Sequence, residues 1–167
     1  MAGSTLVIVV FAGGVLAALL ILTFSVVSYV RDDFQFWPPP VNKPWQYSVF
    51  WVLFRLLVAS LSALCFLDYK GAIGVDSEPR WTDFVSWSLF VLGFGAAFYL
   101  TNFLGWRTAY SVAPEGLRTD GVFAYSRNPI YVVSIIGMIG FGVAIASWFV
   151  AVLLLLWCLF YLLAPWQ

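Results

Sequence analysis

Two stretches of this chain, residues 6–30 and 130–163, contain no charged residue and consist almost entirely of apolar side chains. A bilayer crossing takes about 20 apolar residues. The first stretch is long enough for one crossing and has no basic residue before it, so it differs from a signal peptide. The second is too long for one crossing and too short for two full ones. Both stretches indicate a protein folded in a membrane.

The composition supports this interpretation. Of the 167 residues, 63% are hydrophobic and 10% are charged, whereas soluble domains are roughly 25% charged. Eight Lys and Arg balance eight Asp and Glu, so no net basic charge attracts nucleic acid. Because the chain has no histidine, His-based zinc or haem sites and Ser-His-Asp triads are excluded. We expect no metal cofactor, and we expect Cys65 and Cys158 to be buried as small hydrophobes.

The apolar segments predict an all-α polytopic membrane protein with about five transmembrane helices, the last two forming a short hairpin. Residues 1–167 form a single integral membrane domain in this prediction. The glycines at 137, 140 and 142 are expected to let the two legs of the hairpin approach closely. Tyr99, Thr101 and Asn102 are expected to form interhelical hydrogen bonds, although they are polar enough to line a pocket. The expected helices span residues 6–30, 47–67, 81–104, 130–146 and 148–163, with a loop at 105–129.

The basic residues predict the orientation. Five crossings place Arg31, Lys43, Arg107, Arg118 and Arg127 on one side, and only Lys70 and Arg80 on the other. By the positive-inside rule, the N-terminus is outside, and the loop at 105–129 and the C-terminus are cytoplasmic.

The loop before the fifth apolar segment carries the polar chemistry. Pro129 suits the first position of a helix, and Asn128 before it suits the N-cap, its side chain accepting hydrogen bonds from backbone N–H groups. One interpretation is a capped helix entry with interfacial arginines. Another is a binding site for an anionic ligand, formed by the helix N-terminus and Arg127. Tyr125 and Tyr131 would then supply stacking faces, and Gly121 close backbone approach.

This segment resembles the membrane-embedded isoprenylcysteine carboxyl methyltransferases and the related phospholipid and thiol methyltransferases, in the bacterial variant Ser-Arg-Asn-Pro-x-Tyr. The matching residues are Leu117, Thr119, Gly121, Phe123, Tyr125, Ser126, Arg127, Asn128, Pro129, Ile130 and Tyr131. The hairpin that follows agrees with the architecture of that family.

The resemblance implies an S-adenosylmethionine-dependent methyltransferase of the bacterial inner membrane. Its cofactor would bind at the cytosolic membrane face, and its acceptor would be lipid-linked or a small thiol, carboxylate or amine. Arg55, within the second crossing, would hold an acceptor carboxylate, or else extend toward the interface or pair with Glu115. The implied cofactor-binding residues are Gly121, Tyr125, Arg127, Asn128, Pro129 and Tyr131.

One departure keeps a second function open. Members of that family continue into a tail with paired glutamates, and no Glu follows Glu115 here. The alternative is therefore a non-catalytic accessory subunit of a larger membrane protein complex, built on the same fold. Under both hypotheses the chain contacts membrane lipids.

Overall fold

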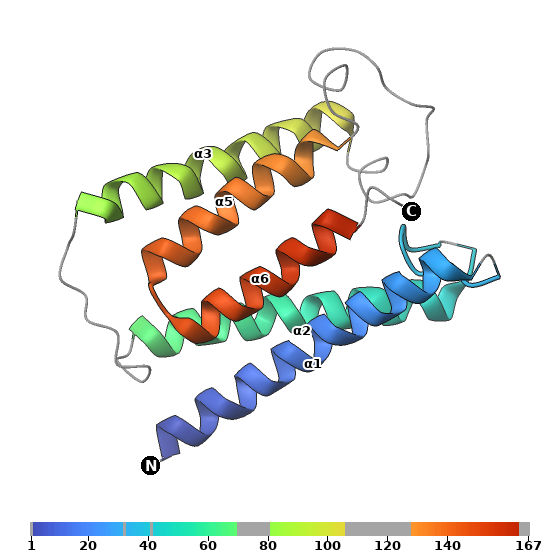
Figure 1. Ribbon diagram of the computed structural model, residues 1–167, viewed down its shortest axis with the longest axis horizontal. Coiled ribbons are helices and arrows are strands. Elements are labelled where there is room, and N and C mark those ends of the chain that lie inside the picture. Colours follow the sequence, from blue (N-terminus) through green and yellow to red (C-terminus); the bar gives the residue numbers. More distant parts are fainter. Residues whose placement is uncertain (1, 32, 41, 70–80, 106–127, 164–167) are drawn as a thin grey trace.

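The computed structural model describes residues 2–31, 33–40, 42–69, 81–105 and 128–163. These residues form five α-helices and no strand, which confirms the expected fold class (Figure 1). The helices are α1 (Ala2–Val30), α2 (Pro44–Tyr69), α3 (Trp81–Leu104), α5 (Pro129–Ile145) and α6 (Trp148–Leu163).

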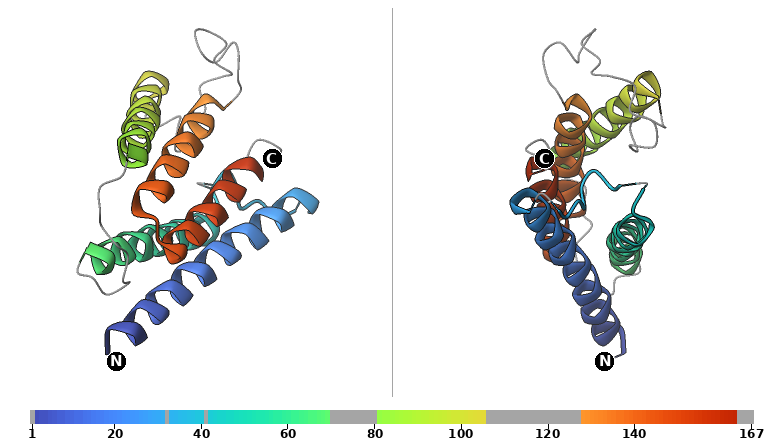
Figure 2. Two further views of the ribbon diagram at one scale, coloured as in Figure 1. Left: turned by 60° about the vertical axis from the view of Figure 1, so that its left-hand side comes forward. Right: turned by 90° about the vertical axis from the view of Figure 1, so that its right-hand side faces the viewer.

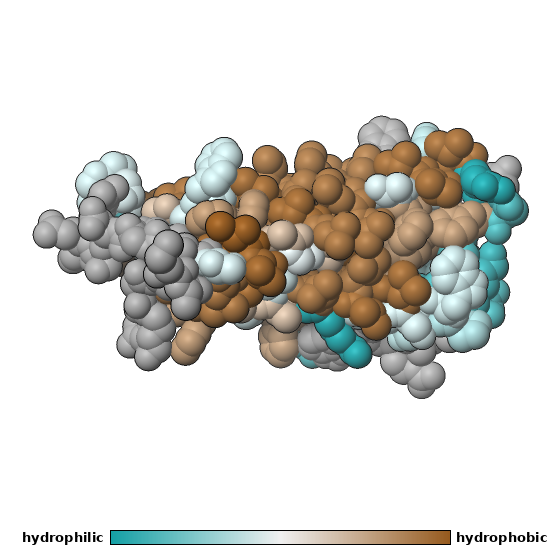
Figure 3. All heavy atoms as spheres, turned by 90° about the horizontal axis from the view of Figure 1, so that it is seen from below, coloured by the Kyte–Doolittle hydropathy of each residue, from teal (hydrophilic) through white to brown (hydrophobic). Residues whose placement is uncertain are grey.

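Three of the helices are long and apolar enough to cross a bilayer, over Thr5–Val30, Pro44–Leu67 and Trp81–Leu104, whereas α5 and α6 are shorter. The surface in Figure 3 is hydrophobic over its middle, and hydrophilic residues gather at one end. Helix α2 begins earlier than the expected residue 47 because Pro44, which has no N–H to lose, occupies a first-turn position. The prolines at 38–40 are outside any helix, as expected.

The helices alternate in direction along the chain (Figure 1). The segment 33–40, Leu104, Asn128 and Leu163 therefore lie at one end of the molecule, which we call the Asn128 end. The start of α1, the end of α2 and the turn between α5 and α6 lie toward the opposite end. This arrangement brings Asn128 to the same end as the α1–α2 connection.

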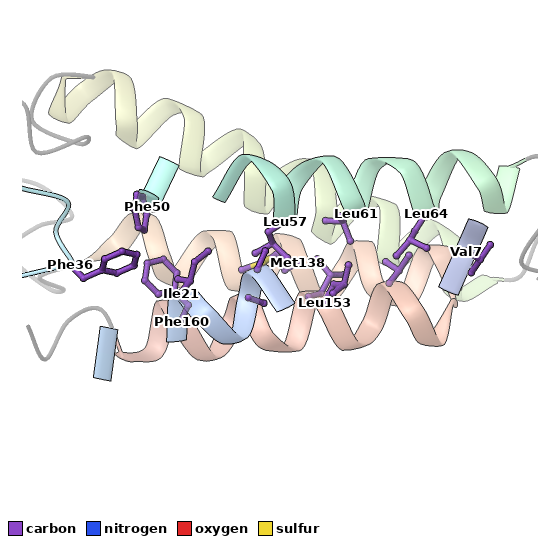
Figure 4. Close-up of a cluster of buried hydrophobic side chains, with 14 residues drawn as sticks. Val7, Ile21, Phe36, Phe50, Leu57, Leu61, Leu64, Met138, Leu153 and Phe160 are labelled. Carbon is purple, nitrogen blue, oxygen red and sulfur yellow. The ribbon is translucent and has the colours of Figure 1, made fainter. Parts of the chain in front are cut away.

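Helix α6 joins two parts of the molecule. It packs against α1, α2 and α5, whereas α3 makes its main contacts with α5. The views in Figures 1 and 2 show α3 beside α5, and α1 beside α2. The shared core follows one face of α6, where Leu153 and Phe160 meet Ile21, Leu57 and Met138 (Figure 4). In lipid this core gains its stability from van der Waals packing rather than from removal of water.

The hairpin expected at residues 130–163 is present. Helix α5 ends at Ile145, and Ala146 adopts the left-handed conformation with φ 53°, its N–H bonded to the Gly142 carbonyl at 3.0 Å. Ser147 follows, and α6 begins at Trp148. Each leg is about 24–26 Å long at 1.5 Å per residue.

The glycines of α5 differ from the expectation. A Cβ on Gly93 of α3 would lie 2.5 Å from Gly137 Cα, and a Cβ on Gly140 would lie 2.6 Å from the backbone nitrogen of Phe90. Only Gly142 faces α6, where a Cβ would meet Leu154 at 3.2 Å. Two of the three glycines thus permit close packing of α5 against α3, and not within the hairpin. The reason is that α3 lies directly against α5, so the small residues serve that contact.

The hydrogen bond observed for Thr101 lies within its own helix and not between helices, contrary to the expectation, and Asn102 also forms a hydrogen bond within this helix. Thr101 Oγ1 donates to the Ala97 carbonyl at 2.8 Å, and Asn102 Nδ2 donates to the Phe98 carbonyl at 2.9 Å, both within α3. Ser62, Ser86 and Ser88 donate to carbonyls of their own helices in the same way. A carbonyl one turn back is the nearest acceptor available in a bilayer, where no water competes.

Candidate functional site

The start of α5 has the predicted backbone arrangement. Asn128 occupies the N-cap with φ −134° and ψ 60°, and Pro129 is the first helical residue. The Asn128 carbonyl accepts hydrogen bonds from the Tyr131 and Val132 N–H groups at 3.1 and 3.4 Å. The Asn128 side chain, however, makes no capping hydrogen bond. The predicted cap position is confirmed, and the predicted side-chain cap is wrong.

Tyr131 connects this helix start to the end of α6. Its ring stacks on that of Tyr161, with centroids 4.7 Å apart and planes 20° apart. It also lies 6.5 Å from the ring of Trp37. Pro129 is buried, and Asn128 and Tyr131 are partly exposed. The structure therefore places a partly accessible aromatic wall directly beside the N-terminus of α5.

Trp37 extends this wall toward α2. Its ring lies 5.0 Å from those of both Phe50 and Phe160, and the Phe160 ring meets it edge-on. Phe36, which is fully buried, lies 5.7 Å from Phe50 (Figure 4). Residues from the α1–α2 connection, from α2, from α5 and from α6 thus meet at the Asn128 end.

Sequence reasoning missed Trp37 and Tyr161 as parts of this site. Trp37 lies directly before three prolines, outside any apolar segment, and Tyr161 belongs to an apolar helix. One indication was present, since Tyr161 is the only hydroxyl-bearing residue of α6. Its stacking on Tyr131 depends on the alignment of two helices, which a single sequence does not show.

Three of the predicted cofactor-binding residues, Gly121, Tyr125 and Arg127, lie outside the described residues, as does Glu115. Arg55 is described, and it is exposed on α2 about 16 Å along the helix from Pro44. Within the described part of the chain it forms no ion pair. The structure thus brings Asn128, Pro129 and Tyr131 together and leaves Arg55 exposed on α2.

Charge at the Asn128 end includes Arg31, whose guanidinium donates to the Asp33 carboxylate at 3.2 and 3.1 Å. This hydrogen bond, followed by the attraction between the two charges, lowers the pKa of Asp33. Lys43 Nζ donates to the Asp33 carbonyl at 3.2 Å. Cys65 and Cys158 are not joined in a disulfide and are partly exposed, less buried than expected. In the described ranges, no three His, Cys, Asp or Glu residues are grouped as metal ligands.

Fold and site together define a helical membrane protein with an aromatic site beside a helix N-terminus. The phospholipid methyltransferase family model matches residues 81–165, just over half of the 167 residues. The chain therefore belongs to the phospholipid methyltransferase family. Comparison with curated proteins and with solved structures gives no match.

The matched range contains α3, α5 and α6, and with them Asn128, Pro129, Tyr131 and Tyr161. Trp37 and Arg55 lie before it. The aromatic wall is thus formed jointly by residues inside and outside the matched range.

Proposed function

We propose that this protein is a membrane-embedded, S-adenosylmethionine-dependent methyltransferase that acts on a lipid-linked or small thiol, carboxylate or amine acceptor. The observation that carries the proposal is the family match over residues 81–165, within which Tyr131 stacks on Tyr161 beside the N-terminus of α5. In this proposal the cofactor binds at the Asn128 end, and Gly121, Tyr125 and Arg127 complete its site.

The described residues fit such a cofactor. S-adenosylmethionine carries a sulfonium cation, and cations are attracted to aromatic faces such as those of Tyr131, Tyr161 and Trp37. It also carries a carboxylate, which suits a helix N-terminus. The helix start at Asn128 lies beside these rings, and its side chain does not cap the helix. Both kinds of group needed by the cofactor are therefore present at one end of the molecule.

The cofactor would supply a methyl group on sulfur for in-line transfer to the acceptor. The protein would contribute positioning and exclusion of water. Tyr131 and Tyr161 would orient the cationic part, and Asn128 and Pro129 would fix the start of α5. Arg55, exposed on α2, would hold an anionic group of an acceptor that arrives from the lipid.

In this proposal the protein resides in the bacterial inner membrane with its N-terminus outside. The 105–129 loop and the C-terminus face the cytoplasm, where the cofactor is made. Lipid-linked acceptors would reach the site sideways from the bilayer.

The test is S-adenosylmethionine binding to the purified protein in detergent by calorimetry. We expect Asn128→Ala and Tyr131→Ala to weaken binding at least tenfold while the helical content is unchanged. The matched control is Tyr29→Ala, since Tyr29 is an exposed tyrosine of α1 and should leave binding intact. Absence of binding by the folded wild-type protein would contradict the proposal and favour an accessory subunit of a larger complex.

A further inference from the structure

Gln46 presents a buried carbonyl oxygen without a donor. The residue is 3% exposed, and its Oε1 has no hydrogen-bond partner within the described ranges. A buried acceptor that is left unpaired destabilises a protein, because it has lost its water without replacement. An unpaired buried carbonyl oxygen therefore calls for an explanation.

Its position relates it to the candidate site. Gln46 lies in the first turn of α2, one turn before Phe50 and on the same face of the helix. Phe50 contacts Trp37 at 5.0 Å and Phe160 at 6.1 Å, and Trp37 in turn contacts Tyr131. Gln46 thus belongs to the Asn128 end, although α2 precedes the range matched by the family model.

The surroundings indicate which kind of group would satisfy Gln46. Its Oε1 accepts from N–H or O–H groups. The Trp37 ring, which contacts Phe50 one turn further along α2, favours a cation. Because α2 and α6 are antiparallel and Phe50 faces Phe160, the last turn of α6 lies beside the first turn of α2. A primary ammonium group combines the required donors with positive charge.

We propose that Gln46 binds, through Oε1, the primary ammonium group of a ligand at the Asn128 end. The proposal rests on the proposed function, in which two ligands carry such a group: S-adenosylmethionine, through its α-amino group, and an amine-bearing lipid acceptor. Gln46 is then a binding residue that the family-matched range does not contain.

The test uses two readouts on the full chain in detergent. Gln46→Met keeps the length of the side chain and removes the amide, and with it the Oε1 acceptor. We expect this change to raise the melting temperature of the ligand-free protein, because an unpaired acceptor is removed, and to weaken binding of the ammonium ligand at least tenfold. Replacement of a glutamine with only a structural role would not raise the melting temperature and weaken ligand binding at the same time.

Ser147 provides the matched control. It is 2% exposed, and its Oγ also lacks a partner within the described ranges, but it lies at the hairpin turn, away from the Asn128 end. Ser147→Ala should raise the melting temperature of the ligand-free protein and leave ligand binding unchanged.

Two arms identify the source of the ammonium group. One compares S-adenosylmethionine with its analogue that lacks the α-amino group, and the other compares phosphatidylethanolamine with phosphatidylcholine, whose headgroup has no N–H. The wild-type protein should bind the ligand that Gln46 contacts more tightly than the compound with which it is compared. In Gln46→Met this difference in affinity should disappear.

A lower melting temperature of ligand-free Gln46→Met would overturn the proposal, because the oxygen would then be satisfied within the chain. Unchanged affinity of this variant for both ammonium ligands would also overturn it. Failure of the wild-type protein to bind S-adenosylmethionine would contradict the proposed function, and the lipid arm would still decide the role of Gln46.

Discussion

At the scale of single residues, the stacked pair Tyr131–Tyr161 links the two legs of the hairpin at the Asn128 end. We predict that Tyr161→Ala weakens S-adenosylmethionine binding by up to about tenfold, because an aromatic pair contributes about 0.5–1.5 kcal/mol beyond its buried area. Tyr161→Phe keeps the ring and should bind nearly as the wild type does. Calorimetry on both variants checks this, and equal loss in both would mean that the hydroxyl, not the ring, matters.

The pH dependence of stability also follows from single residues. The Arg31 guanidinium lowers the pKa of Asp33 below the ordinary value of an aspartate. A carboxylate whose folded pKa is depressed stabilises the fold above its unfolded pKa, and this contribution is lost as the pH falls through the folded value. Since the chain also has no histidine, we predict a melting temperature that is constant between about pH 6 and 8. A steep change of the melting temperature in that pH range would show that another group titrates there.

The sequence allowed prediction of the helix start in the site, but it did not allow prediction of the aromatic wall beside it. A proline after an asparagine restricts the backbone locally, so the helix start at Asn128 and Pro129 followed from two adjacent residues. The positions of Trp37 and Tyr161 depend on how helices far apart in the chain align. Rings in an apolar helix give no local indication of which partner they will meet.

At the scale of helices, the contact between α3 and α5 depends on glycine. A Cβ at Gly93 would lie 2.5 Å from Gly137 Cα, whereas a Cβ at Gly95, two residues along α3, would meet nothing within 4 Å. We predict that Gly93→Ala destabilises the protein by about 1–3 kcal/mol, because the two backbones must separate. Gly95→Ala should be neutral or stabilising by up to about 1 kcal/mol. Thermal unfolding in one detergent compares the two variants, and similar melting temperatures would contradict the close contact.

The contact between α3 and α5 also shows what the sequence could not predict about the helices, which is their choice of neighbour. The lengths of the apolar segments predicted the five helices of the described residues and the hairpin, because a bilayer fixes how long a crossing must be. The small residues of α5 were correctly expected to permit close packing. The helix against which they pack was not predicted. Gly137 and Gly140 face α3 because α3 lies beside α5, and nothing in a single sequence specifies which neighbour a glycine-bearing face will have.

At the scale of the whole molecule, the alternation of five helices puts the segment 33–40 and the start of α3 at opposite ends (Figure 1). Asp33 and Trp81 are both exposed, so a cysteine at either position can be labelled. We predict that, after Cys65 and Cys158 are replaced by alanine, Trp81→Cys reacts with a membrane-impermeant maleimide in intact cells. Asp33→Cys should react only after the membrane is permeabilised, because the positive-inside rule places the more basic end in the cytoplasm. The reverse pattern would invert the proposed orientation and place the Asn128 end outside, away from cytoplasmic S-adenosylmethionine. Labelling of both positions in intact cells would contradict the alternating arrangement itself.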